Sequence, residues 1–229
     1  MARRTPTSSA PPAEQAGPDQ AGKATAKRRS KRGLPKPFLM EAEAGDTSLA
    51  GQVLIAMPAM ADPRFSQGVI LVCAHTPEGA IGIVLNRPAA KPSFTELLEQ
   101  LEVGPIPPAR SIGMCVGGPV DSARGFVLHS TDWIGEGSMR VDTTTALTAS
   151  LDVLKAIAAG NGPADCVLAL GYAGWAAGQL DQEIKQNVWL TATPDRNLLF
   201  DTNHTTKWHR AMASLNIDPI LLSSTAGLA

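Results

Sequence analysis

DCVLALGYAGWAAGQLDQEI, residues 165–184, is the stretch around which the rest of the chain is arranged. It begins with the apolar run CVLAL, which is typical of a strand covered on both faces, although a buried helical segment has the same pattern. Three glycines follow, and glycine permits the positive φ of a sharp turn. From Ala173 onward small and apolar residues recur at helical spacing. We therefore predict a strand, a glycine turn and a helix.

A helix that starts after a glycine turn exposes free N–H groups and the positive end of its dipole, which together attract anions such as phosphate. The spacing G-x-x-G-x-x-x-G differs from the dinucleotide-binding fingerprint G-x-G-x-x-G, and no Walker lysine follows it. The competing interpretation is structural. Here the glycines allow tight packing beside Tyr172 and Trp175, with the small residues on the sheet and the Gln/Glu face outward. The spacing favours this structural interpretation.

Charge is unevenly distributed along the 229 residues, whose formal net charge is −1. Residues 1–36 carry nine Lys or Arg against two acidic residues, about +7, which leaves the remainder at about −8. Residues 1–45 lack apolar periodicity, so we expect a disordered basic tail before a single domain over 46–229. The cluster within 23–36 is the part suited to nucleic acid, and a solubilising tail is the competing interpretation.

The remaining composition indicates a cytoplasmic protein. The longest apolar runs have strand length, well short of the roughly 20 residues of a membrane helix, and no signal-peptide core follows the N-terminal arginines. We therefore expect no membrane association. The three cysteines are an odd number without a C-x-x-C pair, and they fall in apolar runs. This pattern predicts buried, reduced thiols rather than a disulfide framework.

Outside the central stretch, the pattern predicts strands interrupted by helices. Strands are expected at 52–57, 69–75, 80–86, 112–116, 125–129, 139–141, 188–193 and 198–200. Helices are expected after the capping box Ser93/Glu96, after Ser150, and after Thr205 or Thr206. With the central helix, this gives about four helices in an α+β domain rather than regular βαβ winding.

Two pairings of cysteine with histidine suggest chemistry. Cys73 and His75 are two apart on a predicted strand and so share a face, where His129 or Cys166 would complete a zinc site. Cys115 precedes two glycines that suit an oxyanion nest, in a dyad with His129. A single C-x-H is a poor signal for zinc, and we favour a core thiol with a hydrogen-bonded histidine at the end of the strand. Nothing in the sequence brings the dyad together. No catalytic residue is assigned, and no metal or cofactor is expected.

Five motifs in order closely resemble the AlgH/YqgE family, bacterial proteins that are largely uncharacterised. They are GQVLIAMPAMADPRF (51–65), VILVCAHTPEGAIGIVLNRP (69–88), GGPV (117–120), GFVLHS (125–130) and ALGYAGWAAGQLDQEI (169–184). The resemblance implies an α+β domain with a mixed, bifurcated sheet and a small barrel-like part surrounded by helices. It also implies a regulator of gene expression, the label that some members carry, without established catalytic residues. The chain departs from the common family forms at Ala176, Asp181 and Leu228.

Three functions compete on these observations. The first is a regulatory protein without catalysis that acts through a protein or ligand. The second is a small-molecule or nucleotide-binding protein, or a hydrolase-type enzyme, with its site at the 171–178 turn. Its cleft would be lined by Asn86, Arg87, Gly117, Gly118, His129, Tyr172, Trp175 and Gln179. The third is DNA binding through the tail, which predicts a steep dependence on salt. We favour the first.

Overall fold

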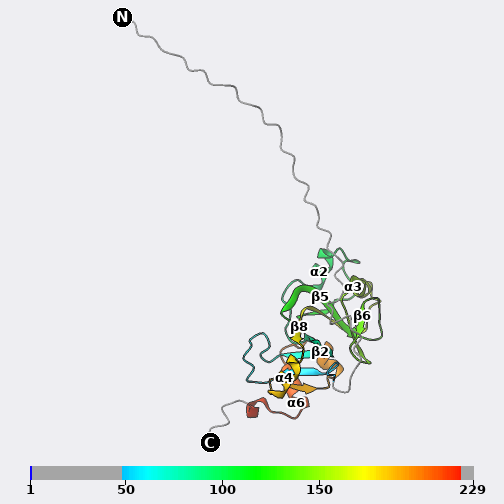
Figure 1. Ribbon diagram of the computed structural model, residues 1–229. Coiled ribbons are helices and arrows are strands. Elements are labelled where there is room, and N and C mark those ends of the chain that lie inside the picture. Colours follow the sequence, from blue (N-terminus) through cyan, green and yellow to red (C-terminus); the bar gives the residue numbers. More distant parts are fainter. Residues whose placement is uncertain (2–47, 223–229) are drawn as a thin grey trace. The chain divides into compact units, whose positions relative to one another are not determined.

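The computed structural model describes residues 48–222, besides Met1 (Figure 1). The strands within this part are β1 (Val53–Ala56), β2 (Val69–Thr76), β3 (Gly79–Val84), β4 (Gly113–Val116), β5 (Val120–Ser130), β6 (Ser138–Arg140), β7 (Thr145–Thr148), β8 (Cys166–Ala176) and β9 (Trp189–Ala192). The helices are α2 (Phe94–Gln100), α3 (Leu151–Ala158), α4 (Gln179–Lys185), α5 (Arg196–Phe200), α6 (Lys207–Ser214) and the 3-10 helix η1 (Pro219–Leu222). The predicted α+β class is confirmed.

The strands form one curled sheet in the order β6-β7-β5-β8-β3-β2-β1-β9, with β4 attached to β8. The β4–β8 pair is parallel and the other pairs are antiparallel, so the sheet is mixed. The sheet divides at β8, whose first half pairs with β4 and with most of β5, and whose second half pairs with β3 and, at Tyr172, with Val120 of β5. The bifurcated, barrel-like sheet that the family resemblance implied is therefore confirmed.

Gly171 lets β8 serve both halves of the sheet. Its φ is +72°, and an added Cβ would lie 2.5 Å from the carbonyl oxygen of Gly118. Before this residue, Val167 and Ala169 belong to the core inside the curl, and after it Tyr172 packs against the same core. The alternation of faces therefore shifts by one residue at Gly171, as it does at a β-bulge.

Three apolar clusters cover the faces of the sheet. The inner cluster lies within the curl and is closed by α5 and α6 through Leu199, Trp208 and Met212. A second cluster joins the outer face of β1, β2 and β3 to α4, and a third joins β5 and the first half of β8 to α2 and α3. Figure 1 shows this division, with α2 and α3 at one end of the sheet and α4 and α6 at the other.

Two local predictions are confirmed. Strands β2 and β3 form the expected hairpin, in which Thr76 pairs with Gly79. Helix α2 begins with the capping box, because the Ser93 hydroxyl accepts the Glu96 N–H at 3.2 Å and the Glu96 carboxylate accepts the Ser93 N–H at 2.7 Å. Both features depend only on neighbouring residues, which is why the sequence alone predicts them.

The predicted helix from Ala173 is wrong in its first part. Strand β8 continues to Ala176, where Ala173 and Gly174 pair with Gly82 and Ile81 of β3. Helix α4 begins only at Gln179. Alanines and glycines fit a strand as well as a helix here because β3 supplies partners for pairing along this segment.

Other strand predictions need correction. The segment 198–200 belongs to helix α5, because the Asp195 carboxylate caps it by accepting the Leu198 N–H at 2.6 Å. Strand β5 starts at Val120 rather than near 125, and β7 was not predicted. Ser150 precedes α3 as expected but makes no capping hydrogen bond with its side chain. The predicted tail 1–45 and its cluster within 23–36 lie outside the described residues and stay predictions.

Candidate functional site

Asn86 and Arg87, the first two predicted cleft residues, hold the loop that precedes β2. The Asn86 side chain accepts the Val69 N–H at 3.0 Å and donates to the Gln67 carbonyl at 2.7 Å. Arg87 donates to the Ser66 carbonyl at 2.5 Å. These bonds satisfy loop backbone groups, so both side chains have structural partners in this conformation.

Gly117, Gly118 and Tyr172 lie together at the division of the sheet. An added Cβ would lie 2.3 Å from the Gly171 carbonyl oxygen at Gly117 and 2.1 Å from the Tyr172 carbonyl carbon at Gly118. The two glycines therefore let the β4–β5 connection touch the backbone of β8. Tyr172 packs edge-to-face on Phe126, with ring centroids 5.8 Å apart. Burial raises the pKa of the Tyr172 hydroxyl.

Trp175 and Gln179 meet at a carboxylate that the sequence interpretation placed on the outward face of its helix. Glu183 accepts the indole N–H groups of Trp175 at 2.9 Å and Trp189 at 2.8 Å on one oxygen. Its other oxygen accepts the Gln179 amide at 2.8 Å. The two tryptophans in the sequence were the available indication of this contact, because a buried indole N–H requires an acceptor.

His129 lies apart from the other seven residues and is fully buried. Its Nδ1 is 2.9 Å from the Ser130 carbonyl oxygen, which only accepts, so the proton belongs on Nδ1. Its Nε2 then accepts from the Thr148 hydroxyl at 2.8 Å, and Thr148 contacts Ser138 at 2.7 Å. Burial lowers the pKa of His129, which favours the neutral ring.

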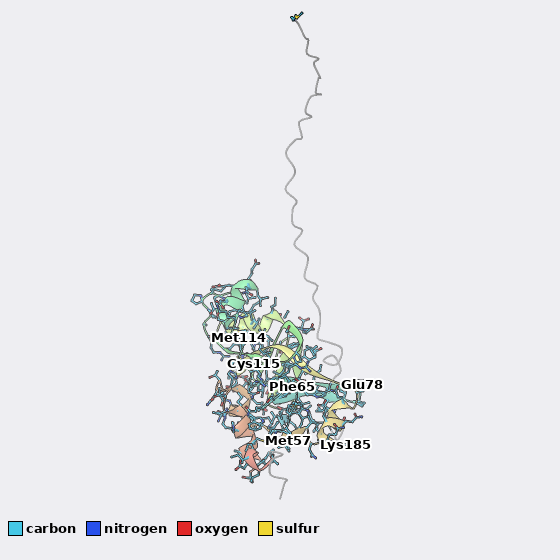
Figure 2. All side chains as sticks on the ribbon, turned by 90° about the vertical axis from the view of Figure 1, so that its left-hand side faces the viewer. Met57, Phe65, Glu78, Met114, Cys115 and Lys185 are labelled. Atoms are coloured by element: carbon cyan, nitrogen blue, oxygen red, sulfur yellow. The ribbon has the colours of Figure 1, made fainter. Side chains whose placement is uncertain are left out.

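The Cys115–His129 dyad is not formed. Cys115 pairs with Ala169 across β4 and β8, whereas His129 pairs with Cys166 at the start of β8. Both imidazole nitrogens of His129 already have partners. Burial raises the pKa of Cys115 to about 12, which disfavours a thiolate. Figure 2 labels Cys115 beside Met114 on β4.

The zinc arrangement fails because of an irregularity in β2. The register with β3 shifts between Val72 and Ala74, so Cys73 belongs to the inner core while His75 turns toward α4. His75 Nε2 lies 3.4 Å from the Asp181 carboxylate. Within residues 48–222, no three His, Cys, Asp or Glu side chains gather as metal ligands would. All three cysteines are free; Cys73 and Cys115 are buried, and Cys166 is half-buried.

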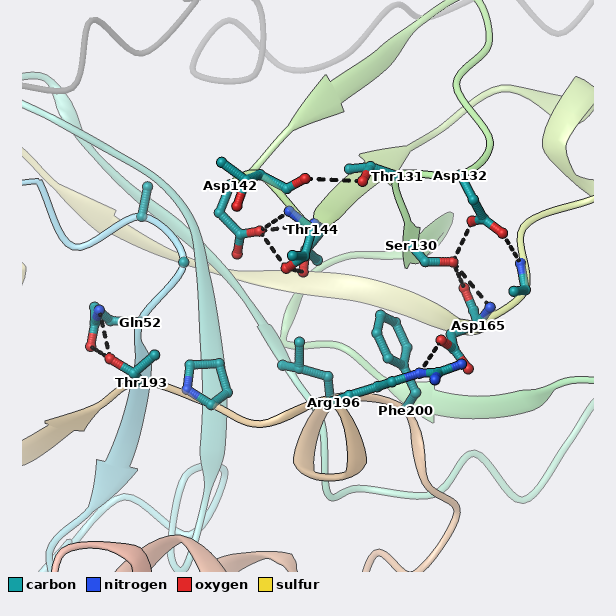
Figure 3. Close-up of a pocket in the computed structure, with 17 residues that line it drawn as sticks. Gln52, Ser130, Thr131, Asp132, Asp142, Thr144, Asp165, Thr193, Arg196 and Phe200 are labelled. Carbon is teal, nitrogen blue, oxygen red and sulfur yellow. Dashed lines mark hydrogen bonds and ion pairs between the residues drawn. The ribbon is translucent and has the colours of Figure 1, made fainter.

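A cavity lies at one rim of the curled sheet, and none of the eight predicted residues lines it. It has a volume of about 730 Å³, within the usual range for small-molecule sites. Its walls come from segments at the ends of five strands: 50–52 before β1, 130–132 after β5, 142–145 before and into β7, 164–165 before β8, and 193–200 after β9. We call it the rim pocket (Figure 3).

Three carboxylates and one guanidinium give the rim pocket its charge. Asp132 accepts from the Ser130 hydroxyl at 2.5 Å and the Ala164 N–H at 3.0 Å. The Ser130 hydrogen bond holds the pKa of Asp132 below its usual value. Asp165 forms an ion pair with Arg196, which extends from α5 across the pocket in Figure 3. The third carboxylate, Asp142, has no ion-pair partner among the described residues.

Asp142 shapes the turn between β6 and β7. Its Oδ1 accepts the N–H of Thr144 at 2.7 Å, the hydroxyl of Thr144 at 2.9 Å and the N–H of Thr145 at 2.8 Å. The run Asp-Thr-Thr-Thr was a local signal for such a turn, since aspartate caps the backbone two and three residues on. Sequence reasoning missed the pocket because its five segments are far apart in the chain.

A smaller cavity of about 370 Å³ lies near α4. It is lined by residues that follow β1 and residues that precede β9: Met57, Ala59, Met60, Ala61, Asp62, Gln186, Asn187 and Val188. Figure 2 shows Met57 at the same end of the molecule as Lys185. The predicted 171–178 turn lines neither cavity. Gly171 lies inside β8, so the predicted strand–turn–helix order occurs later in the chain than expected, with the turn at 177–178 and Gly178 directly before the seven-residue helix α4.

The family model with the description "AlgH-like" (DUF179) matches residues 53–220. This chain belongs to the AlgH-like family. A UPF0301 protein of Rhodospirillum rubrum is 52% identical over 191 residues, covering 83% of this chain and 98% of the relative. A UPF0301 protein of Gluconobacter oxydans is 49% identical over 184 residues, covering 80% and 98%. The resemblance found in the sequence is therefore confirmed.

Two solved structures have the AlgH-like fold. The solution structure of AlgH from Pseudomonas aeruginosa matches with a TM-score of 0.66 and 43% identity, covering 82% of this chain and 99% of that one. A crystal structure of protein DIP2367 from Corynebacterium diphtheriae matches with a TM-score of 0.61, 82% and 98% coverage and 21% identity, a likeness of fold alone. Among the described helices of this AlgH-like chain, none combines the length and apolar character needed to cross a membrane.

Proposed function

We propose that this AlgH-like chain is a cytoplasmic regulatory protein that binds a small polar molecule in the rim pocket. The cavity itself is the observation that carries the proposal. It has the volume of a small-molecule site and combines apolar residues such as Leu199 and Phe200 with carboxylates and hydroxyls. This mixture of an apolar surface and a few polar groups is typical of ligand sites.

The hydrogen bonds of the pocket favour binding over catalysis. The Ser130 hydroxyl donates to the ionised Asp132 carboxylate, and the neighbouring His129 ring directs its Nδ1 to the backbone carbonyl of Ser130. A serine nucleophile needs its hydroxyl hydrogen-bonded to a general base that accepts the proton. Here the nearby imidazole contacts the wrong atom, and the low pKa of Asp132 makes that carboxylate a weak base.

The position of the pocket suggests how binding would be transmitted. Segments 50–52 and 193–200 belong to the part of the sheet that holds β1 and β9, and segments 130–132 and 142–145 belong to the part that holds β5 and β7. A ligand that contacts both parts stabilises the arrangement in which they are closest. A partner protein that binds this arrangement preferentially would respond to the presence of the ligand. Control of gene expression through such a partner is our proposal, supported by the family label.

Native mass spectrometry of protein purified from its own cells tests the proposal. Thr143 lines the pocket, and its side chain makes no hydrogen bond to another described residue. Thr143→Trp is therefore designed to fill the cavity without breaking a side-chain hydrogen bond. Ala59→Trp, in the smaller cavity, is the matched control. We expect a bound small molecule on the wild type and on Ala59→Trp, and none on Thr143→Trp. The same occupancy on both variants, or bare chains throughout, would refute the rim pocket as the site.

A further inference from the structure

Six residues with hydroxyl groups line the rim pocket, and most of these hydroxyls already donate a hydrogen bond to the protein. Four of them donate to oxygen atoms of the pocket's own walls: Ser130 to Asp132 at 2.5 Å, Thr131 to the Thr143 carbonyl at 3.0 Å, Thr144 to Asp142 at 2.9 Å, and Thr193 to Gln52 at 3.4 Å. A hydroxyl has one proton and two acceptor lone pairs. What these groups present to a ligand is therefore acceptor capacity.

The carboxylates add more acceptors. All three hydrogen bonds to Asp142 go to Oδ1, whereas Oδ2 lies against Gly51, 3.1 Å from where an added Cβ would be. Gly51 also lines the pocket. Arg196, the one cationic side chain of the lining, is already paired with Asp165. Three carboxylates against one guanidinium leave the lining with a net charge of about −2 when all are ionised.

Three classes of ligand can be compared on this lining. An anion meets the repulsion of the carboxylates and a guanidinium that is already engaged. A neutral polyol has one acceptor oxygen for every donor proton. In a lining that offers mainly acceptors, many of the polyol's oxygens would find no donor. An ammonium group has three donors and no acceptor, which matches a lining of carboxylate and hydroxyl lone pairs. The charge and the hydrogen-bond inventory therefore favour the same class.

We propose that the rim pocket binds a small aliphatic amine carrying two positive charges. This inference rests on the proposed function and names the ligand class of the same site. One ammonium group is bound by Asp142, the other by Asp132 and Asp165, and the methylene chain packs on Leu199 and Phe200 at the α5 side. Long aliphatic stems with a charged end commonly pack this way along apolar surface.

The charge of Arg196 gives a second prediction for binding of the diamine. Its guanidinium places a positive charge in the pocket, and its side chain is 71% exposed. A ligand ammonium competes with it for Asp165 and is repelled by it. Removing this charge should strengthen binding of a diamine, whereas removing the charge of Asp142 should weaken it. Opposite effects of two substitutions on the same cavity distinguish charge recognition from mere filling of space.

The experiment is calorimetric titration of the full chain with 1,4-diaminobutane, and with myo-inositol and inorganic phosphate as comparison probes. Asp142→Asn keeps an oxygen for the turn bonds and should weaken diamine binding by about fivefold, the effect of an ion pair near the surface. Arg196→Gln should strengthen it by a similar factor. Glu78→Gln, an exposed acidic position in the β2–β3 turn, is the matched control and should leave it unchanged. Thr143→Trp should abolish it.

The outcomes separate the two proposals. Equal weakening by Asp142→Asn and Glu78→Gln would mean general attraction to an acidic domain and would overturn the diamine inference. Binding of myo-inositol or phosphate that Thr143→Trp removes, with no diamine binding, would also overturn it while supporting the proposed function. Absence of binding for all three probes, together with a bare mass in the native spectrum, would overturn both. If Asp142→Asn fails to fold, the opposite-sign Arg196→Gln effect remains the deciding measurement.

Discussion

Glu183 holds helix α4 to the sheet by accepting two indole N–H groups, and replacing it is the most direct test of the fold. Trp175 and Trp189 are 8% and 3% exposed. In Glu183→Ala both donors lose their acceptor, at 2.9 and 2.8 Å, and Gln179 loses a third bond. Leaving a buried donor unsatisfied costs about 1–3 kcal/mol.

The two indoles share one oxygen, so their losses are not independent. We therefore expect Glu183→Ala to lower the free energy of unfolding by about 2–4 kcal/mol, and the melting temperature by about 5–12 °C for a chain of this size. Glu183→Gln keeps one oxygen for the indoles but sets an amide against the Gln179 amide. Glu183→Gln should therefore lower the free energy of unfolding by less, about 1 kcal/mol.

Urea unfolding followed by circular dichroism measures these differences without relying on tryptophan emission. Gln182→Ala is the matched control, since Gln182 is exposed on the same helix and an exposed substitution there should change stability by no more than about 0.5 kcal/mol. A loss for Glu183→Ala that equals the control would refute the argument. It would mean that the indole bonds are replaced by water at no cost, and that α4 is held by apolar packing alone.

Three further predictions concern other parts of the domain. Gly171→Ala should lower the free energy of unfolding by more than about 2 kcal/mol, because the φ of Gly171 is +72° and the new Cβ would meet the Gly118 carbonyl. Gly174→Ala should lower it much less, because the nearest atom to its new Cβ would be 3.4 Å away. Thermal melts in which the two variants lose the same stability would contradict this. The pKa of His129 is lowered in the folded chain, so below about pH 6.5 the unfolded chain binds a proton that the folded chain does not. The free energy of unfolding should therefore fall as the pH drops from 6.5. Urea titrations from pH 5 to 8 measure this dependence, and His129→Gln should make it weaker. Ser93→Ala removes the capping box of α2 and should cost about 1 kcal/mol in the same assay, and a loss within error would show that Glu96 alone caps the helix.

Local chemistry explains which parts of the fold could be predicted. The β2–β3 hairpin and the capping box of α2 depend on a few adjacent residues, and both were predicted. The continuation of β8 was missed because the shift of faces at Gly171 breaks the two-residue period, so Ala173 and Ala177 fit a helical spacing by chance. Helix α5 was missed because three apolar residues in a row resemble a short strand, although Asp195 carried a capping signal.

The candidate site was less predictable than the fold. Asn86 and Trp175 stood out because their residue types suggest binding, yet each satisfies a partner within the structure. The rim pocket is lined by common residues, aspartates and threonines, whose significance depends on the meeting of five strand ends. Only the folded sheet brings residue 51 against residue 142. No spacing within one segment encodes that contact.

The shared strand β8 has a consequence for how the domain comes apart. Because it pairs with β4 and most of β5 through its first half and with β3 through its second, neither half of the sheet can detach without leaving a run of unpaired backbone groups. Partial opening should therefore be rare, and the described part of the chain should unfold as one cooperative block. In native-state hydrogen exchange, the amides of Val167, Ala169 and Ala173 should therefore exchange together, at the rate set by global unfolding of the described part.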